Sequence, residues 1–121
     1  AAASFFGKRI SYRALQALTE KIADALYFLG VRQGDRVAIM LPNCPQMVIS
    51  YFGALRLGAV VVNTNPLYVE REMVHQFNDA GAETLITLDL FYEKAKNSME
   101  ETTLRRIIFT GVQDFLPLIL K

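Results

Sequence analysis

The chain has 121 residues, of which 52% are hydrophobic and 21% are charged, and its formal net charge is +1. This composition excludes an intrinsically disordered protein, and the nearly balanced charge gives no electrostatic reason to expect a nucleic-acid partner. A single cysteine excludes an internal disulfide and a zinc site built from several cysteines. It also fits a cytoplasmic protein, and no apolar run is long enough to span a bilayer.

The first thirty residues predict a short hairpin followed by a helix. Residues 4–10 have the pattern of two short strands joined at Gly7, and we expect this hairpin to pair with strands outside the chain. Ser11 can cap a helix that runs over residues 12–29 and ends at Gly30. Apolar side chains recur in it at steps of three or four residues, as one helical stripe: Leu15, Leu18, Ile22, Leu26 and Leu29.

From residue 36 onward, short apolar runs alternate with helical segments. The runs lack a polar face, which is typical of strands covered on both sides. The predicted elements are strands at 36–41, 59–62, 84–88 and 106–110, and helices at 46–57, 70–79 and 91–99. This alternation predicts a parallel, doubly wound α/β sheet of about four strands with helices on both faces. Numbered along the chain, the four strands are expected in the order 2-1-3-4.

Ligands of open parallel sheets gather at the carboxyl ends of the strands, which directs attention to three loops, 42–45, 63–68 and 89–90. Neither a G-x-G-x-x-G motif nor a G-x-x-x-x-G-K-[ST] motif occurs, so we predict no autonomous nucleotide site. Asp89 takes the place of the phospho-acceptor of a receiver domain. The loop after the first strand of the sheet has no acidic residue, however, and this argues against that class.

Two more residues are candidates for chemistry. Cys44 precedes a helix, whose dipole lowers a thiol pKa, but no base lies near it in the sequence and a packed small residue is the preferred interpretation. His75 falls on the helix face opposite Met73 and Phe77, which indicates a solvent-exposed side chain. We therefore predict no catalytic residue and no metal site in these residues.

The apolar segment 115–120 is expected to be a helix whose apolar face packs on missing neighbours, in preference to a membrane or acyl-chain contact. The mean hydropathy of +0.22 is high for a small domain. Together with a start that lacks Met, these features lead us to expect a piece of a larger protein.

Four segments resemble, in this order and spacing, the N-terminal part of the adenylate-forming enzymes. They are KRISYRAL at 8–15, GDRVAIMLPN at 34–43, YFGALRLGAV at 51–60 and NTNPLY at 63–68. Within that superfamily, LPNCPQ and NTNPLY are most similar to long-chain fatty-acid–CoA ligases. The resemblance implies that residues 1–121 are a partial N-terminal domain, inactive alone, because the superfamily's phosphate loop, ribose-binding acid and catalytic lysine lie downstream.

The family's reaction, by this resemblance, uses ATP, Mg²⁺ and CoA to convert a fatty acid first into an acyl-adenylate and then into a thioester. Related acetate-activating enzymes touch CoA at the loop that corresponds to Asn63, Thr64 and Asn65. Outward-facing amides and a helix start at this loop, with Lys94 and Lys96 nearby, are expected to suit the CoA phosphates. The alternative is that Asn65 and Pro66 simply end a strand and begin a helix.

The resemblance implies fatty acid, ATP, CoA and the rest of the same polypeptide as partners, in the cytoplasm. It leaves peripheral membrane association and a homodimer open. Val69 stands where the family often has Thr or Ser, so a helix cap is expected to be missing there. The competing interpretation of the whole chain is a stand-alone, flavodoxin-like binding or signalling module.

Overall fold

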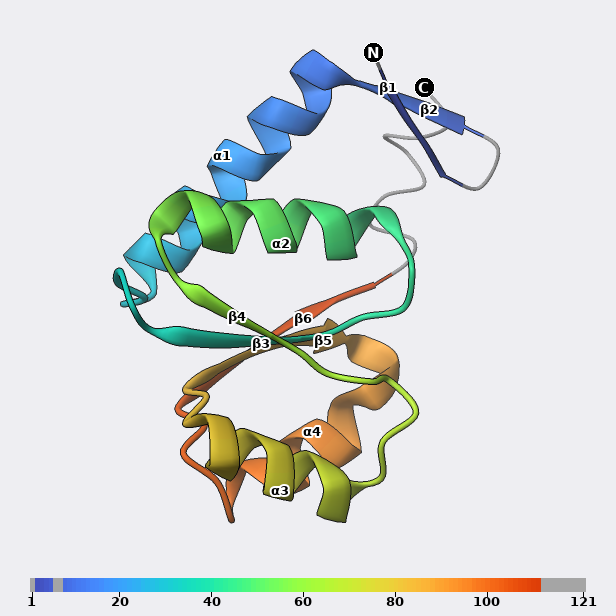
Figure 1. The fold of residues 1–121 in the computed structure, drawn as a ribbon. Coiled ribbons are helices and arrows are strands. Elements are labelled where there is room, and N and C mark those ends of the chain that lie inside the picture. Colours follow the sequence, from blue (N-terminus) through green and yellow to red (C-terminus); the bar gives the residue numbers. More distant parts are fainter. Residues whose placement is uncertain (1, 6–7, 112–121) are drawn as a thin grey trace.

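The computed structural model describes residues 2–5 and 8–111, and Figure 1 shows a central sheet between two layers of helices. In chain order the elements are β1 (Ala2–Phe5), β2 (Lys8–Ser11), α1 (Tyr12–Phe28), β3 (Arg36–Met40), α2 (Pro45–Leu57), β4 (Val60–Asn63), α3 (Glu70–Ala80), β5 (Thr84–Leu88), the 3-10 helix η1 (Asp89–Phe91), α4 (Tyr92–Met99) and β6 (Arg106–Thr110). The predicted helix at 115–120 lies outside the described residues.

The central sheet has four parallel strands in the order β4-β3-β5-β6. This is the predicted order, and the predicted α/β class is confirmed. The register puts Ala38 of β3 beside Val62 of β4 on one side and Leu85 of β5 on the other. β3 and β5 are therefore the central strands, and β4 and β6 are the two edges.

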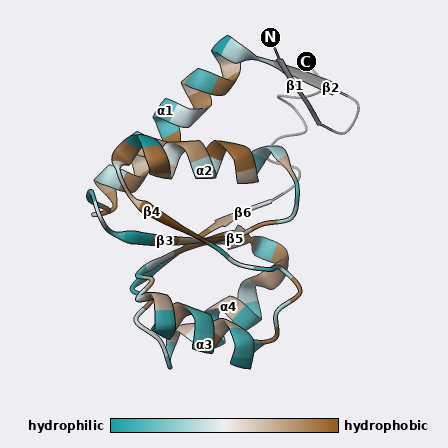
Figure 2. Cartoon of the chain, viewed as in Figure 1, coloured by the Kyte–Doolittle hydropathy of each residue, from teal (hydrophilic) through white to brown (hydrophobic). Residues whose placement is uncertain are grey.

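The central strands are apolar on both faces because each face is covered by its own pair of helices. Val37 and Ile39 of β3 pack in one hydrophobic cluster with Leu26 of α1 and Ala54 of α2. The alternate residues, Ala38 and Met40, belong to a second cluster on the side of α3 and α4, with core residues Met73, Phe77 and Ala95. In Figure 2, β4 and much of α2 are brown, whereas α3 is largely teal.

One predicted strand differs from its observed counterpart. Residues 59–62 read as a buried strand, but β4 covers Val60–Asn63 and lies at an edge, where Val60 is 48% exposed. Its side chains still divide between the two clusters, with Val61 on one and Val62 on the other. The strand prediction is right and its burial is wrong, since an edge strand has only one neighbour to cover it.

The N-terminal hairpin pairs with itself, and its antiparallel register joins Ala2 to Ser11. In Figure 1 it lies beyond the start of α1, away from the sheet. The Ser11 hydroxyl accepts a hydrogen bond from the Ala14 amide at 3.1 Å, which is the predicted cap. α1 ends at Phe28, and Gly30 takes a φ of 109° where the chain turns toward β3. Within the described residues no helix is both long and apolar enough to cross a membrane.

Candidate functional site

Three loops lie at the carboxyl-terminal end of the sheet, because β3, β4 and β5 are parallel and their carboxyl ends point the same way. We call this end of the sheet the site edge, as distinct from the edge strands β4 and β6. They are the β3–α2 loop (residues 41–44), the β4–α3 loop (residues 64–69) and the segment of η1, all on the right-hand side of Figure 1. The predicted site edge thus exists as a single surface. The chemistry available there depends on which polar groups remain unengaged.

The β4–α3 loop contains the residues predicted for the CoA side. The side chain of Asn63 is exposed and has no hydrogen-bond partner within residues 8–111. Thr64 is buried, and its amide donates to the Ile39 carbonyl of β3 at 2.9 Å. Asn65 is exposed but uses its side-chain oxygen to accept from the Leu67 amide at 2.9 Å. Two exposed amide side chains therefore flank one buried anchor.

Several backbone amides of this loop are engaged in hydrogen bonds and do not face outward as predicted. The Tyr68 amide donates to the Asn65 carbonyl at 3.0 Å, and the Val69 amide donates to Oε1 of Glu72 at 3.1 Å. The first turn of α3 also carries two carboxylates, Glu70 and Glu72, which oppose an anion at this helix start. These two carboxylates make the start of α3 an unfavourable place for a phosphate, so we look to the side chains of the loop for such a contact.

Lys94 supports the loop directly. Its Nζ donates to the Pro66 carbonyl at 2.7 Å and to the Tyr68 carbonyl at 2.9 Å. Lys96 lies on the same helix, is exposed, and has its Nζ 5.6 Å from the ring centroid of Tyr92. The structure therefore brings the two predicted stretches, the loop and the start of α4, into contact. Lys94 is engaged by the loop, and Lys96 is open to solvent.

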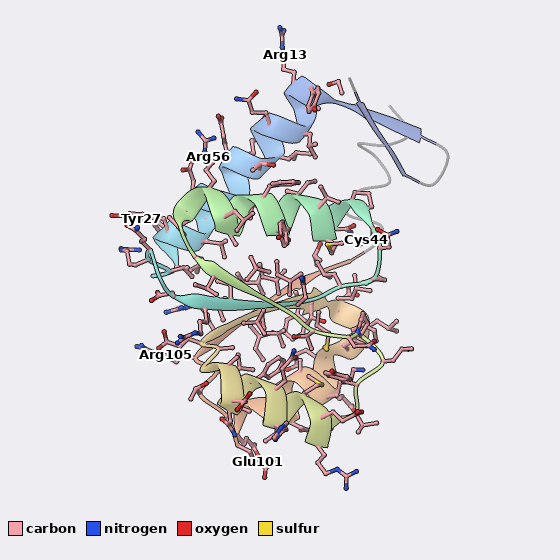
Figure 3. The ribbon with its side chains drawn as sticks, in the orientation of Figure 1. Arg13, Tyr27, Cys44, Arg56, Glu101 and Arg105 are labelled. Atoms are coloured by element: carbon pink, nitrogen blue, oxygen red, sulfur yellow. The ribbon has the colours of Figure 1, made fainter. Side chains whose placement is uncertain are left out.

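The thiol of Cys44 lies at the start of α2, facing the interior (Figure 3). Burial raises the pKa of this thiol above its ordinary value, and backbone amides of Met47 and Gln46 offset this only in part. The predicted lowering of the pKa by the helix dipole is wrong because desolvation is the larger effect. Cys44 is a packed residue, which confirms the preferred interpretation.

The other two candidate residues, His75 and Asp89, both have exposed side chains. His75 is exposed on α3 and lines an open depression of about 480 Å³ with Tyr68 and Asp79. Asp89 is exposed at the start of η1. Among the residues that the structure describes, no three His, Cys, Asp or Glu side chains lie close enough to hold a metal ion together.

Gln46, at the start of α2, is a buried polar residue to which the sequence assigned no role. It is 3% exposed, and its Nε2 donates to the Gly111 carbonyl at 2.8 Å, joining the start of α2 to the end of β6. Its Oε1 has no partner in the described part of the chain, and Gln46 is one of the residues that line an apolar cavity of about 110 Å³. No local pattern could predict this hydrogen bond, because the two bonded residues are 65 positions apart.

Comparison with known proteins identifies the family. A family model described as AMP-binding enzyme matches residues 1–118. A long-chain-fatty-acid–CoA ligase of Bacillus subtilis is 46% identical over 116 residues, which cover 96% of this chain and 21% of that protein. The corresponding ligase of Salmonella typhimurium is 40% identical over 91% of this chain and 20% of its own length. The chain thus spans about a fifth of the length of the curated relatives it matches.

Solved structures agree with this result. A long-chain-fatty-acid–CoA ligase from Archaeoglobus fulgidus has a TM-score of 0.82 at 27% identity, over 93% of this chain and 24% of that one. A fatty acyl CoA synthetase of Mycobacterium tuberculosis has a TM-score of 0.77 at 27% identity, over 88% and 22%. These matches decide against a flavodoxin-like module. With its sheet, its loops and nearly its whole length matched, the chain belongs to the AMP-binding enzyme family.

Proposed function

We propose that this chain is one flank of the N-terminal domain of an ATP-dependent long-chain fatty-acid–CoA ligase. The observation that carries the proposal is the 46% identity to the Bacillus subtilis ligase over 96% of the chain. The exposed apolar side chains support a partial domain, since Phe28 is 87% exposed and β6 has a partner on one side only among the described strands. Residues 1–121 would then be covered by the rest of the same polypeptide.

The proposed reaction has two steps. The carboxylate oxygen of the fatty acid attacks the α-phosphorus of ATP, forming an acyl-adenylate and releasing pyrophosphate. The CoA thiolate then attacks the acyl carbon, and AMP leaves with the bonding electron pair. Within this scheme the described residues form a scaffold. The sheet fixes the β3–α2 and β4–α3 loops at its carboxyl-terminal end. The acidic residues and lysines that carry out the reaction would come from other parts of the same polypeptide.

We assign Asn63, Thr64 and Asn65 to the CoA side of the site. The exposed amide side chains of Asn63 and Asn65 can donate to and accept from a polar ligand, while buried Thr64 holds the loop to β3 through its amide. The exposed ammonium of Lys96 is available for a phosphate. This assignment rests on the exposure of the Asn63 and Asn65 side chains and on the position of the loop at the carboxyl-terminal end of the sheet.

ATP and Mg²⁺ are assigned to the reaction but not to residues of this chain. Among the described residues, no three His, Cys, Asp or Glu side chains lie close enough to hold a metal ion together.

We further propose a cytoplasmic enzyme that meets a membrane only at its surface to collect its apolar substrate. Sedimentation with and without phospholipid vesicles tests this, and the sedimentation coefficient separates a monomer from a homodimer.

The function is tested on the complete protein that contains these residues. We expect AMP formation that requires ATP, CoA and palmitate together. A second candidate substrate class is aromatic acids, because 4-coumarate–CoA ligase 3 of Arabidopsis thaliana is 37% identical over 81% of the chain. Activity with 4-coumarate and none with palmitate would replace the fatty-acid proposal by this one.

The proposal also predicts that the 121-residue chain alone forms no acyl-CoA. AMP release by the purified chain, dependent on palmitate and CoA, would contradict the assignment of catalysis to other residues. A matched preparation of the complete protein serves as the positive control.

A further inference from the structure

The side chain of Lys94 is held in an unusual place for a surface lysine. It is half-buried, with Nζ 4.3 Å from the centroid of the Phe91 ring, and donates to the carbonyls of Pro66 and Tyr68. An ionised donor makes hydrogen bonds about twice as strong as a neutral one, and partial removal from water strengthens them further. The amine therefore joins α4 to the β4–α3 loop across 26 to 28 positions of sequence.

The loop has separate anchors at its two ends. At the start, the Thr64 amide bonds to the Ile39 carbonyl, and Nε2 of Gln76 donates to the Asn63 carbonyl at 3.0 Å. Near the end, Lys94 donates hydrogen bonds to the carbonyls of Pro66 and Tyr68, the residues on either side of the exposed Leu67. Leu67 is 86% exposed and contributes little packing, so this part of the loop is attached by the two hydrogen bonds of Lys94 and by Tyr68, which packs on the second cluster.

We propose that Lys94 is a positioning residue for CoA: its ammonium fixes the conformation of the β4–α3 loop that presents Asn63 and Asn65. This rests on the proposed function above. The amine itself is occupied by two carbonyls and acts through the loop. Loss of the amine should therefore weaken the second half-reaction, in which CoA enters, and leave the first half-reaction, which does not use CoA, unchanged.

The test uses the complete protein with Lys94→Met, which keeps most of the apolar stem and removes the donors, and Lys94→Arg, which keeps a charged donor. Lys21→Met is the matched control, because Lys21 is exposed on α1, far from the loop in the sequence. For Lys94→Met we expect the KM for CoA to rise about tenfold. Palmitate-dependent ATP–pyrophosphate exchange should stay within about twofold of the parent. Lys94→Arg should recover part of the loss.

Amide hydrogen exchange adds a readout independent of activity. In Lys94→Met the peptide that covers residues 63–70 should exchange faster, and the core strands β3 and β5 should be unchanged. If Lys94→Met does not yield folded protein, Lys94→Gln is measured in the same way.

The outcomes separate the two proposals. Unchanged exchange at 63–70, an unchanged KM for CoA, or equal losses in both half-reactions would each overturn the role of Lys94. A parent protein with no CoA-dependent activity would overturn the proposed function and the CoA role with it, while the exchange data would still report whether Lys94 holds the loop.

Discussion

Gly53 of α2 lies so close to Ile22 of α1 that a Cβ added to Gly53 would be 2.6 Å from Cγ2 of Ile22. The Thr19 carbonyl oxygen would lie 3.3 Å from the same added Cβ. Both a side chain and the backbone of α1 therefore leave no room for a Cβ at position 53. Ile22 is β-branched and has little rotamer freedom within a helix. The contact between these two helices therefore depends on the absence of a side chain at position 53.

We predict that Gly53→Ala destabilises the protein. Alanine improves helix propensity by about 0.5–1 kcal/mol, but forcing a methyl group into this contact costs about 1–3 kcal/mol. We expect the clash to win and denaturant unfolding to show a net loss. The double variant Gly53→Ala with Ile22→Ala should be more stable than the sum of the single changes implies, by about 1 kcal/mol. Full additivity would show that the Ile22 side chain does not oppose the added methyl group.

A buried hydroxyl inside the sheet gives a second prediction. Thr87 of β5 is fully buried, and its Oγ1 donates to the Met40 carbonyl of β3 at 2.8 Å. Thr87→Val preserves the shape and removes the donor, so we expect a loss of about 1–3 kcal/mol in the free energy of unfolding. Thr19→Val is the control, because the Thr19 hydroxyl bonds to no group in the described residues, and it should change stability by less than about 0.5 kcal/mol.

The missing N-cap of α3 gives a third prediction. Val69 occupies the N-cap of α3 with an extended backbone and makes no side-chain cap, while Glu72 already accepts from the Val69 amide. Val69→Ser supplies the absent oxygen and completes a capping box. We expect a gain of about 0.5–2 kcal/mol and a higher Tm. Val69→Ala, which adds no oxygen, should gain nothing; an equal gain in both variants would assign the effect to lost exposed valine.

The buried thiol gives a prediction about pH. Burial raises the pKa of Cys44, so the folded protein keeps this proton to higher pH than the unfolded chain does. Its contribution to stability is complete below the ordinary thiol pKa and is lost as the pH rises toward the raised value. Denaturant unfolding at alkaline pH should therefore show a decline that Cys44→Ala lacks. Rapid alkylation of Cys44 in the folded protein at neutral pH would contradict this.

The sequence predicted the central strands better than the edges. Apart from Arg36, Thr84 and Thr87, the runs at 36–41 and 84–88 are apolar because two helical layers cover them, and that pattern is visible in the residues. The valines of β4 look the same in sequence, yet one of them is half exposed. Burial depends on how many neighbours a strand has, and an apolar run does not record that number.

The candidate site was predicted less completely. Its edge of the sheet followed from strand direction, but the role of Lys94 depends on a contact between residues 26 to 28 positions apart, for which no local pattern exists. Cys44 shows the same limit. A local rule, the helix dipole, predicted a lowered pKa, and the burial that raises it arises only when α2 packs on the sheet.

The strand order has a consequence for synthesis on the ribosome. β4 joins one side of β3, β5 joins the other, and β6 adds outside β5, so every strand takes a free border of those made before it. No pair that has formed must open to admit a later one. A nascent chain can consequently assemble this sheet step by step as it emerges.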